Sequence, residues 1–287
     1  MSFTIFTDTG SDYSDSMAKE MGVKVLPLTY IINGESYISI TDELMKFAYN
    51  ALREKANVST SCCNVYTIQS ELEKELKKGN DIIYLAFSSG LSATYNNAIE
   101  ARDNLAKEYQ NSKIYIIDSL SASLGHGMLV TYASKLKNEG KSIEEVVDFI
   151  ESNKLRLTHL FTVDNLYHLY NGGRITKSTY LIATVAKIKP IMHVNDEGKL
   201  EALTKVISRR KSLNTLINMT LESIDSNSKD LIYVSHGDCL EDALYIKRKL
   251  LEKLPESEIY IDYISPVIGM HSGPGTVAVF YFSKHRI

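Results

Sequence analysis

The stretch SSGLSAT, residues 88–94, places four hydroxyl side chains and one glycine between an apolar run, IIYLAF, and a segment expected to be helical. Unpaired backbone N–H groups and the positive end of the helix dipole lie at the start of any helix. Gly90 allows the backbone to turn sharply or to approach a ligand closely. Together with the hydroxyl of Ser92, these features suit the binding of a carboxylate or phosphate. Capping of the helix by Ser92 or Thr94 explains the same residues equally well.

Two loops known from enzymes, the nucleotide-binding P-loop and the nucleophile elbow of hydrolases, have sequence patterns that can be compared with residues 88–94. A nucleotide-binding P-loop ends in Gly-Lys-Ser/Thr, and residues 88–94 contain no lysine. The loop matches the first part of a nucleophile elbow but has a threonine where the last glycine is required. Ser92, Asp118 and His271 nevertheless follow one another in the chain order of an α/β-hydrolase triad. A serine hydrolase acting on acyl esters through Ser92 is therefore kept as an alternative function.

A second hydroxyl-rich segment is VSTSCCN, residues 58–64, which precedes another expected helix. Thr60 and Ser61 could face the same anion as the first loop. Capping of the helix by Asn64 is the simpler explanation when the segment is considered alone. Its two cysteines are adjacent, which is too close for a normal pair of metal ligands or an easy disulfide. The sequence predicts no metal site here or elsewhere.

The segment GMHSGPG, residues 269–275, surrounds a histidine with three glycines and a proline just before a strongly apolar strand. Gly273 and Gly275 are expected to shape a rigid turn that fixes the orientation of the His271 ring. A single histidine is more often structural than functional, and the chain contains seven. His271 is the best functional candidate among them because of its rigid surroundings.

Two arginines complete the set of candidate residues. Arg174 follows a Gly-Gly pair at an expected turn before a helix, and Arg209 opens the short basic cluster Arg-Arg-Lys. A guanidinium group suits carboxylate or phosphate recognition. A solvated arginine at a helix end accounts for Arg174 equally well.

The overall composition excludes several classes of protein. The 287 residues carry 32 basic and 35 acidic side chains, a net charge of −3, without a basic stripe, which argues against nucleic-acid binding. The first residues lack the pattern of a signal peptide, and no apolar run is long enough to span a membrane. Three cysteines do not indicate a disulfide framework. We expect a reduced, cytoplasmic protein.

Short apolar runs alternate with helical segments over residues 1–155, which predicts an α/β fold whose N-terminal domain has three layers and a parallel sheet. Residues 156–287 predict an α+β domain with a mixed sheet, because Asn-Asp-Glu-Gly at 195–198 marks an antiparallel hairpin. The expected strands are 3–7, 23–32, 82–87, 113–118, 157–163, 189–194, 199–207, 231–235, 258–263 and 276–283. The expected helices are 14–21, 42–54, 65–78, 94–108, 122–138, 142–152, 209–224 and 240–253.

Taken together, these segments resemble the DegV family. The family motifs have counterparts in the same order over residues 8–275, which is essentially the whole chain. The counterparts are Asp8 to Asp12 for DS-x-S/T-D, Thr60 to Asn64 for TSQPS, Ser88 to Tyr95 for SSGLSGTY, Ile117 to Ser119 for IDS, Gly172 to Ile175 for GGRI, Lys189 to Ile191 for KPI, and His271 to Gly275 for H-S/T-GPG. No single motif is decisive, and the resemblance depends on all seven occurring in the same order.

The resemblance implies a carrier without chemistry or cofactor of its own that buries one long-chain fatty acid. The carboxylate would lie at the domain junction on Thr60, Ser61 and Ser92, with His271 completing the polar network, and residues 156–287 would enclose the acyl tail. These hydroxyls would replace the water around the carboxylate.

The resemblance also implies a partner, a separate ATP-dependent fatty acid kinase that converts the bound acid to an acyl phosphate. Arg174 and Arg209 would belong to the kinase-facing surface. A transient contact with a membrane surface is compatible with such a carrier. A third interpretation is a regulatory sensor, in which lipid occupancy changes a protein partner.

Three positions depart from the family pattern. Cys62 and Cys63 replace the Gln-Pro of TSQPS, and Ala93 replaces a glycine. Ile207 stands where the family has an arginine in KVR. The first two departures leave the carboxylate-binding hydroxyls in place, whereas the third bears on the kinase partnership.

Overall fold

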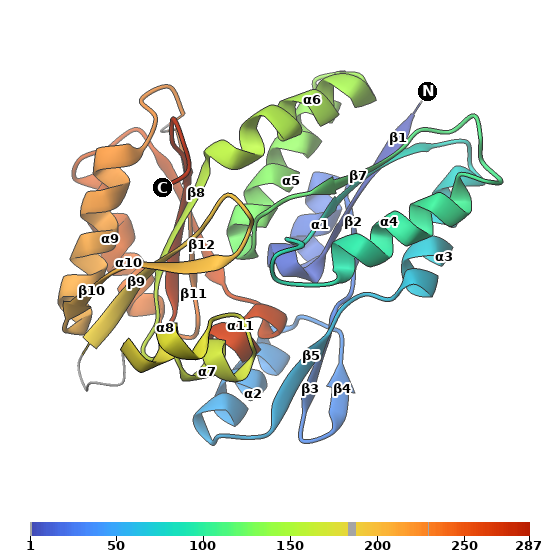
Figure 1. Ribbon diagram of the computed structural model, residues 1–287. Coiled ribbons are helices and arrows are strands. Elements are labelled where there is room, and N and C mark those ends of the chain that lie inside the picture. The colour runs from blue at the N-terminus through green and yellow to red at the C-terminus, as the bar shows by residue number, and fades with distance from the viewer. Residues whose placement is uncertain (1, 183–187, 229) are drawn as a thin grey trace.

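The computed structural model describes residues 2–182, 188–228 and 230–287, and two sheets side by side form its framework (Figure 1). The first sheet is parallel throughout, with the strand order β2-β1-β6-β7. Its strands are β1 (Phe3–Asp8), β2 (Lys24–Leu26), β6 (Asp81–Ala86) and β7 (Ile114–Asp118). All six residues of β6 are buried, as expected for a parallel strand that is covered on both faces.

Helices cover both faces of this sheet, and alternate residues of its strands pack against them. Phe6 and Tyr84 belong to the cluster on one face, whereas Ile5 and Ile83 belong to the cluster on the other. The first face is covered by α3 (Val65–Leu76) and α4 (Thr94–Leu105); the second by α1 (Asp15–Met21), α5 (Ser123–Asn138) and α6 (Ile143–Asn153). The predicted three-layer arrangement is therefore present.

The second sheet is mixed and has the strand order β10-β9-β8-β13-β11-β12. Only the pair β11–β12 is parallel, and β9 and β10 form the expected hairpin. The strands are β8 (Leu157–Thr162), β9 (Ile188–Val194), β10 (Leu200–Ile207), β11 (Leu231–His236), β12 (Glu258–Tyr263) and β13 (Val277–Phe282). Helices α9 (Arg209–Ser223) and α10 (Leu240–Leu251) cover one face.

The opposite face of the second sheet packs against α5, which also contacts the first sheet. Figure 1 shows this helix lying between the two sheets. Leu124 and Met128 of α5 share one hydrophobic cluster with Ile5 of β1 and Phe280 of β13. The two halves are thus joined by a continuous core, and the domain boundary near residue 155 stays a prediction.

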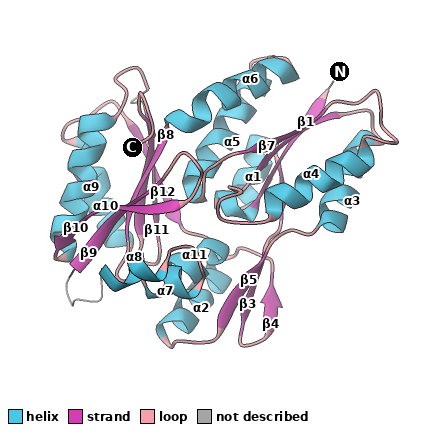
Figure 2. Ribbon diagram, viewed as in Figure 1, coloured by secondary structure: helices cyan, strands magenta, loops and turns pink. Residues whose placement is uncertain are grey.

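The structure corrects the expected strand over residues 23–32. Pro27 separates β2 from β3 (Thr29–Ile32), because proline lacks the N–H that a sheet ladder requires. β3 belongs to a third, antiparallel sheet with the order β4-β3-β5, which the sequence did not predict. Its other strands are β4 (Glu35–Tyr37) and β5 (Val58–Ser61), and α2 (Asp42–Arg53) connects them. Figure 2 shows this small sheet set apart from the two larger ones.

A second correction concerns the glycine-rich segment before β13. Residues expected to form only a turn include α11 (Pro266–Ser272), which begins with proline at its first position, where no N–H is needed. His271 lies in the last turn of this helix, and Gly273 follows it with a φ of +80°.

The described elements also include two short helices, α7 (Tyr167–Asn171) and α8 (Lys177–Ile182), and the 3₁₀ turns η1 (Thr9–Ser11) and η2 (Lys154–Arg156).

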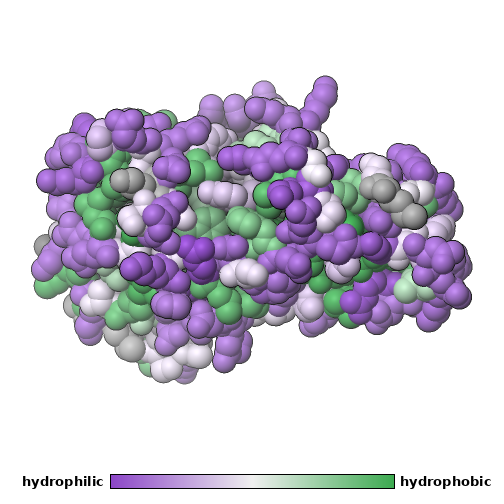
Figure 3. Space-filling view, turned by 90° about the horizontal axis from the view of Figure 1, so that it is seen from above, coloured by the Kyte–Doolittle hydropathy of each residue, from purple (hydrophilic) through white to green (hydrophobic). Residues whose placement is uncertain are grey.

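The remaining predicted helices and strands occur with ends shifted by at most a few residues. The prediction for α6 is confirmed in detail, because Ser142 and Glu145 form a capping box. Among the described residues, no helix combines the length and apolarity needed to cross a membrane. Hydrophilic side chains cover much of the face drawn in Figure 3, with apolar ones interspersed among them.

Candidate functional site

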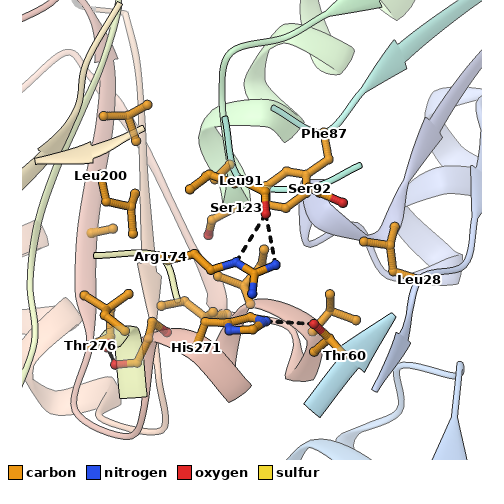
Figure 4. Close-up of a pocket in the computed structure, with 18 of the residues that line it drawn as sticks. Leu28, Thr60, Phe87, Leu91, Ser92, Ser123, Arg174, Leu200, His271 and Thr276 are labelled. Atoms are coloured by element: carbon orange, nitrogen blue, oxygen red, sulfur yellow. Dashed lines mark hydrogen bonds between the residues drawn. The ribbon is translucent and has the colours of Figure 1, made fainter. Parts of the chain in front are cut away.

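A cavity of about 350 Å³ lies where the N-terminal loops meet the second sheet and α11. Its walls come from segments far apart in the chain, including β5, the loop between β6 and α4, the start of α5, and strands β8, β9, β10 and β13. Thr60, Ser92, Arg174 and His271 lie near one another in this wall, and apolar side chains form most of the rest of it (Figure 4). Figure 4 shows Leu200 on the side of the cavity away from Thr60.

The structure brings Thr60, Ser61, Ser92 and His271 together in the wall of this cavity. Thr60 Oγ1 lies 2.7 Å from His271 Nε2, so the end of β5 is hydrogen bonded to α11 (Figure 4). Ser92 Oγ lies 2.9 Å from Thr94 Oγ1 and accepts the backbone N–H of Thr94 at 3.2 Å. The N-cap residue of α4 is Ala93, which makes no side-chain capping bond, so the expected capping by Ser92 or Thr94 is not found. Ser92 lines the cavity, and its binding of an anion stays a prediction. Asn64 caps α3, as the simpler explanation required.

His271 is held in its neutral form. Burial and, to a smaller extent, the nearby positive charge of Arg174 together lower the pKa of its imidazole to about 3. The ring nitrogen Nδ1 has no hydrogen-bond partner among the described residues. It faces Gly172, and a Cβ atom placed on Gly172 would lie 2.1 Å from Nδ1. The first glycine of the Gly-Gly pair thus makes room for the histidine ring.

Replacing Gly172 with alanine is expected to displace the His271 ring and break its hydrogen bond to Thr60. Overpacking of this kind costs about 1–3 kcal/mol of unfolding free energy. Imidazole ¹H–¹⁵N NMR spectra would report the changed environment of His271, and urea unfolding would report the stability. Gly173→Asn is the control, because nothing lies within 4 Å of a Cβ atom there and asparagine tolerates the φ of +73°. Unaltered His271 signals in Gly172→Ala would contradict the close contact.

Both arginines make contacts within the chain. Arg174 lies half-buried in the cavity wall, and its place on a partner-facing surface stays a prediction. Its guanidinium donates two hydrogen bonds to the Leu91 carbonyl, at 3.2 and 3.0 Å, and one to the Gly172 carbonyl. Figure 4 shows it reaching between Leu91 and the His271–Thr60 pair. Arg209 forms an ion pair with Asp242 at 2.8 Å, and its contact with a partner stays a prediction.

The three glycines expected to shape loops have distinct roles. A Cβ atom placed on Gly90 would lie 2.7–2.8 Å from backbone atoms of Glu197 and Gly198 in the β9–β10 turn. The close approach at Gly90 is therefore to another part of the chain. Gly273 and Gly275 adopt φ values of +80° and +81°, which disfavour residues with a Cβ atom.

The described residues do not assemble the hydrolase triad that chain order allowed. His271 Nε2 is hydrogen bonded to Thr60, and Nδ1, the atom that a triad aspartate would hold, has no such partner among them. Asp118 instead accepts the backbone N–H groups of Ser89 and Leu120, both at 3.1 Å. Over the same described residues, no three metal-ligating side chains are grouped.

The residues of the apolar wall and one buried polar residue were not predicted from the sequence. Phe161, Val194, Leu200 and Phe280 come from four strands of the second sheet, and only the folded topology brings them together. His159 lies among them with 1 % of its surface exposed, and burial holds its pKa well below its usual value. The period-two pattern of β8 does place residues 159 and 161 on one face, which was a usable signal.

Two large sheets that share a central helix, a third small sheet and a cavity where they meet define an α/β protein with a cavity at the junction of its two halves. The DegV family, described as a family of uncharacterised proteins, matches residues 2–284. The chain therefore belongs to the DegV family, and the resemblance found in its motifs is confirmed.

Relatives match over nearly their whole length. A DegV domain-containing protein of Clostridium perfringens is 43% identical over 286 residues, covering 99% of this chain and 98% of the relative. A fatty-acid-binding DegV family protein of Thermus thermophilus has a TM-score of 0.88 and 26% identity, covering 99% of this chain and all of the other. DegV of Bacillus subtilis, a fatty acid binding protein, has a TM-score of 0.85 and 26% identity with the same coverage. These matches confirm the predicted fold class.

Proposed function

We propose that this protein binds one long-chain fatty acid in the cavity, with the carboxylate among Thr60, Ser61, Ser92 and His271. The observation that carries the proposal is a single cavity whose wall combines Thr60, Ser61, Ser92 and His271 with many apolar side chains. The fatty acid binding of the Thermus and Bacillus relatives supports it. A cavity of about 350 Å³ is within the usual range of small-molecule sites, ~300–1,000 Å³.

Burial of the acyl tail would supply most of the affinity. Each buried methylene contributes about 0.8 kcal/mol, so ~14 of them supply on the order of 11 kcal/mol before the costs of ordering. The polar side then needs only to replace the hydration that the carboxylate loses. Hydroxyl donors do this without holding the carboxylate as tightly as a bidentate arginine would.

The cavity wall also carries a positive charge that would offset the charge of the bound carboxylate. Burial lowers the pKa of Arg174, whose guanidinium contacts backbone carbonyls and lines the same cavity. An uncompensated charge is unfavourable inside a protein, and an anion beside Arg174 would offset it. We infer that Arg174 stabilises the bound carboxylate by its proximity while His271 stays neutral.

We further propose that a separate ATP-dependent kinase phosphorylates the bound carboxylate to an acyl phosphate. The polar side of the cavity adjoins the surface, since Ser61 and Ala93 line the cavity and are exposed. A reactive carboxylate held there would be within reach of a partner's active site. The protein itself would supply binding and orientation but no covalent step.

Mass spectrometry of the natively purified and then denatured protein tests the binding directly. We expect one released fatty acid per chain, which would also name the ligand. Release of a different small molecule, together with no uptake of added fatty acid, would refute the proposal. Stoichiometric labelling of Ser92 by a fluorophosphonate probe would favour the hydrolase instead.

A protein carrying both Thr60→Ala and Ser92→Ala is expected to bind fatty acid at least about a hundredfold more weakly, because hydrogen bonds to a charged group are worth ~1.5–3 kcal/mol each. Its rate of acyl phosphate formation with a cognate kinase and ATP should fall as well. Displacement of a fluorescent fatty acid measures the first effect and hydroxylamine trapping the second. Ser89→Ala is the control, since Ser89 is an exposed hydroxyl of the same loop. Wild-type values for both assays would refute the assigned carboxylate site.

A further inference from the structure

Arg286 is a buried cation, 9% exposed, in the segment that follows β13. All five of its N–H groups are used, four on backbone carbonyls and one on a hydroxyl, and none on a carboxylate. The acceptors are the carbonyls of Leu157 at 2.9 Å, Leu120 at 2.8 Å, Asn195 at 3.0 Å and Lys154 at 2.6 Å, and Ser121 Oγ at 3.4 Å. Such complete use of a guanidinium fixes the positions of its acceptors.

The acceptors belong to three separate parts of the fold. Leu120 and Ser121 lie in the loop between β7 and α5, in the N-terminal half. Asn195 lies in the β9–β10 turn, and Lys154 and Leu157 lie where the chain passes from α6 to β8. One side chain therefore fastens a loop of the first half to a hairpin of the second.

Both fastened segments continue directly into the apolar wall of the cavity. Ala122 follows the first segment, and Val194 precedes Asn195; both line the cavity, as does Leu200 at the start of β10. Leu200 lies on the side of the cavity away from Thr60 (Figure 4). The contacts of Arg286 thus support residues on the tail side of the cavity, and the hairpin turn it holds also contacts the loop of residues 88–90 through the Ser88–Gly198 hydrogen bond.

The loop that Arg286 holds is itself strained. Leu120 and Ser123 have φ values of +48° and +57°, a region that residues with a Cβ atom seldom adopt. Such conformations persist only where the surroundings fix them. The Leu120 carbonyl is fixed by Arg286, and Ser123 Oγ by hydrogen bonds to Asp12 and to Ser235 Oγ.

We propose that Arg286 is a positioning residue that closes the apolar end of the cavity and so sets the affinity for long acyl chains over short ones. The inference rests on the proposed fatty acid binding and extends it to chain-length selection. Arg286 acts through the residues it holds, because its guanidinium contacts the backbone behind the wall. Without it, the loop and the hairpin can separate, and water reaches the last methylenes of a long tail.

The effect should depend on chain length, which separates it from a loss of general stability. Each methylene that returns to water weakens binding about fourfold. In Arg286→Met, exposure of the last two or three methylenes should weaken stearic acid binding about fifteen- to sixtyfold. Decanoic acid, whose tail leaves that end empty, should bind within about twofold of its wild-type affinity.

The affinities of decanoic, myristic and stearic acid, measured by displacement of a fluorescent fatty acid, test the proposal. Arg156→Met is the matched control: Arg156 also contacts the segment after β13, through the Ser283 carbonyl, and pairs with Asp225 at 2.7 Å. It makes none of the contacts to Leu120 or Asn195. This control should not change the ratio of stearic to decanoic acid affinity.

Each outcome decides one of the two proposals. An equal loss for all three acids, or the same length dependence in Arg156→Met, would overturn the role of Arg286. Failure of all three acids to bind the wild-type protein would overturn the proposed function itself. If Arg286→Met does not fold, Arg286→Lys takes its place, because a lysine keeps the charge but cannot reach all five acceptors. An unchanged length dependence in Arg286→Lys would then count against the proposal.

Discussion

A Gly90→Ala protein is expected to lose about 1–3 kcal/mol of unfolding free energy, because the added methyl group must displace backbone. Its Cβ atom would lie 2.7 Å from the Glu197 carbonyl oxygen and 2.8 Å from two backbone atoms of Gly198. Ser88 Oγ also donates a hydrogen bond to the Gly198 carbonyl at 2.8 Å, so the loop and the turn are held together. Urea unfolding at neutral pH measures the change.

The same substitution should weaken fatty acid binding, because the displaced turn precedes Leu200 in the cavity wall. Ser89→Ala tests whether any substitution in the loop has this effect, since Ser89 is exposed and its side chain does not line the cavity. We expect wild-type stability and affinity for Ser89→Ala. A Gly90→Ala protein that matched the wild type in both measurements would show that the loop and the turn are not in this contact.

The large elements of the fold could be predicted because their signals are local. β6 is an apolar run of the length of a buried strand, and the helices around it begin and end at recognisable residues such as Ser142. The third sheet carries no comparable signal. β4 and β5 are short strands with exposed or half-buried residues, and only pairing with β3 makes them strands. α11 was missed because its glycine and proline content indicates a turn.

The polar side of the cavity was predictable in residue type but not in geometry. Hydroxyls beside strand ends indicated an anion site, and Thr60, Ser92 and His271 do line one cavity. The contact between Gly172 and the His271 ring, and the position of Arg174 in the wall, depend on how residues about 100 positions apart are packed. No local pattern encodes such packing, so the apolar wall and the contacts of Arg286 were absent from the prediction.

Burial in the cavity wall and in the core around it disfavours the charged form of histidine. Burial is the largest cause that lowers the pKa of each of five histidines. They are His126, His159, His168, His236 and His271. Two buried carboxyl groups behave in the opposite way. Burial raises the pKa of Asp12 to about 7 and that of Asp8 above its usual value. These groups together determine how stability depends on pH.

Acidification from pH 7 to pH 5 is therefore expected to lower the unfolding free energy. A histidine whose folded pKa is depressed stabilises the fold above its unfolded pKa of ~6.5, and this stability is lost as the pH falls below that value. Carboxyl groups with raised pKa values favour the protonated native state, so Asp8 and Asp12 oppose the trend. Because five histidines act in one direction and two aspartates in the other, we expect the unfolding free energy to fall on acidification. Urea unfolding at a series of pH values measures it.

His159→Gln isolates one of these contributions, because His159 is 1% exposed and its Nδ1 is 3.2 Å from the Leu157 carbonyl oxygen, which can only accept. Nδ1 therefore carries the hydrogen, and Nε2, which has no partner among the described residues, would have to be protonated in a buried site. Removing this site should reduce the slope of unfolding free energy between pH 5 and pH 6 by about 1.4 kcal/mol per pH unit. His285→Gln, at an exposed position, should keep the wild-type slope. A His159→Gln protein with an unchanged slope would mean that His159 takes up its proton in the folded state, and the apolar wall beside it would then have to admit water.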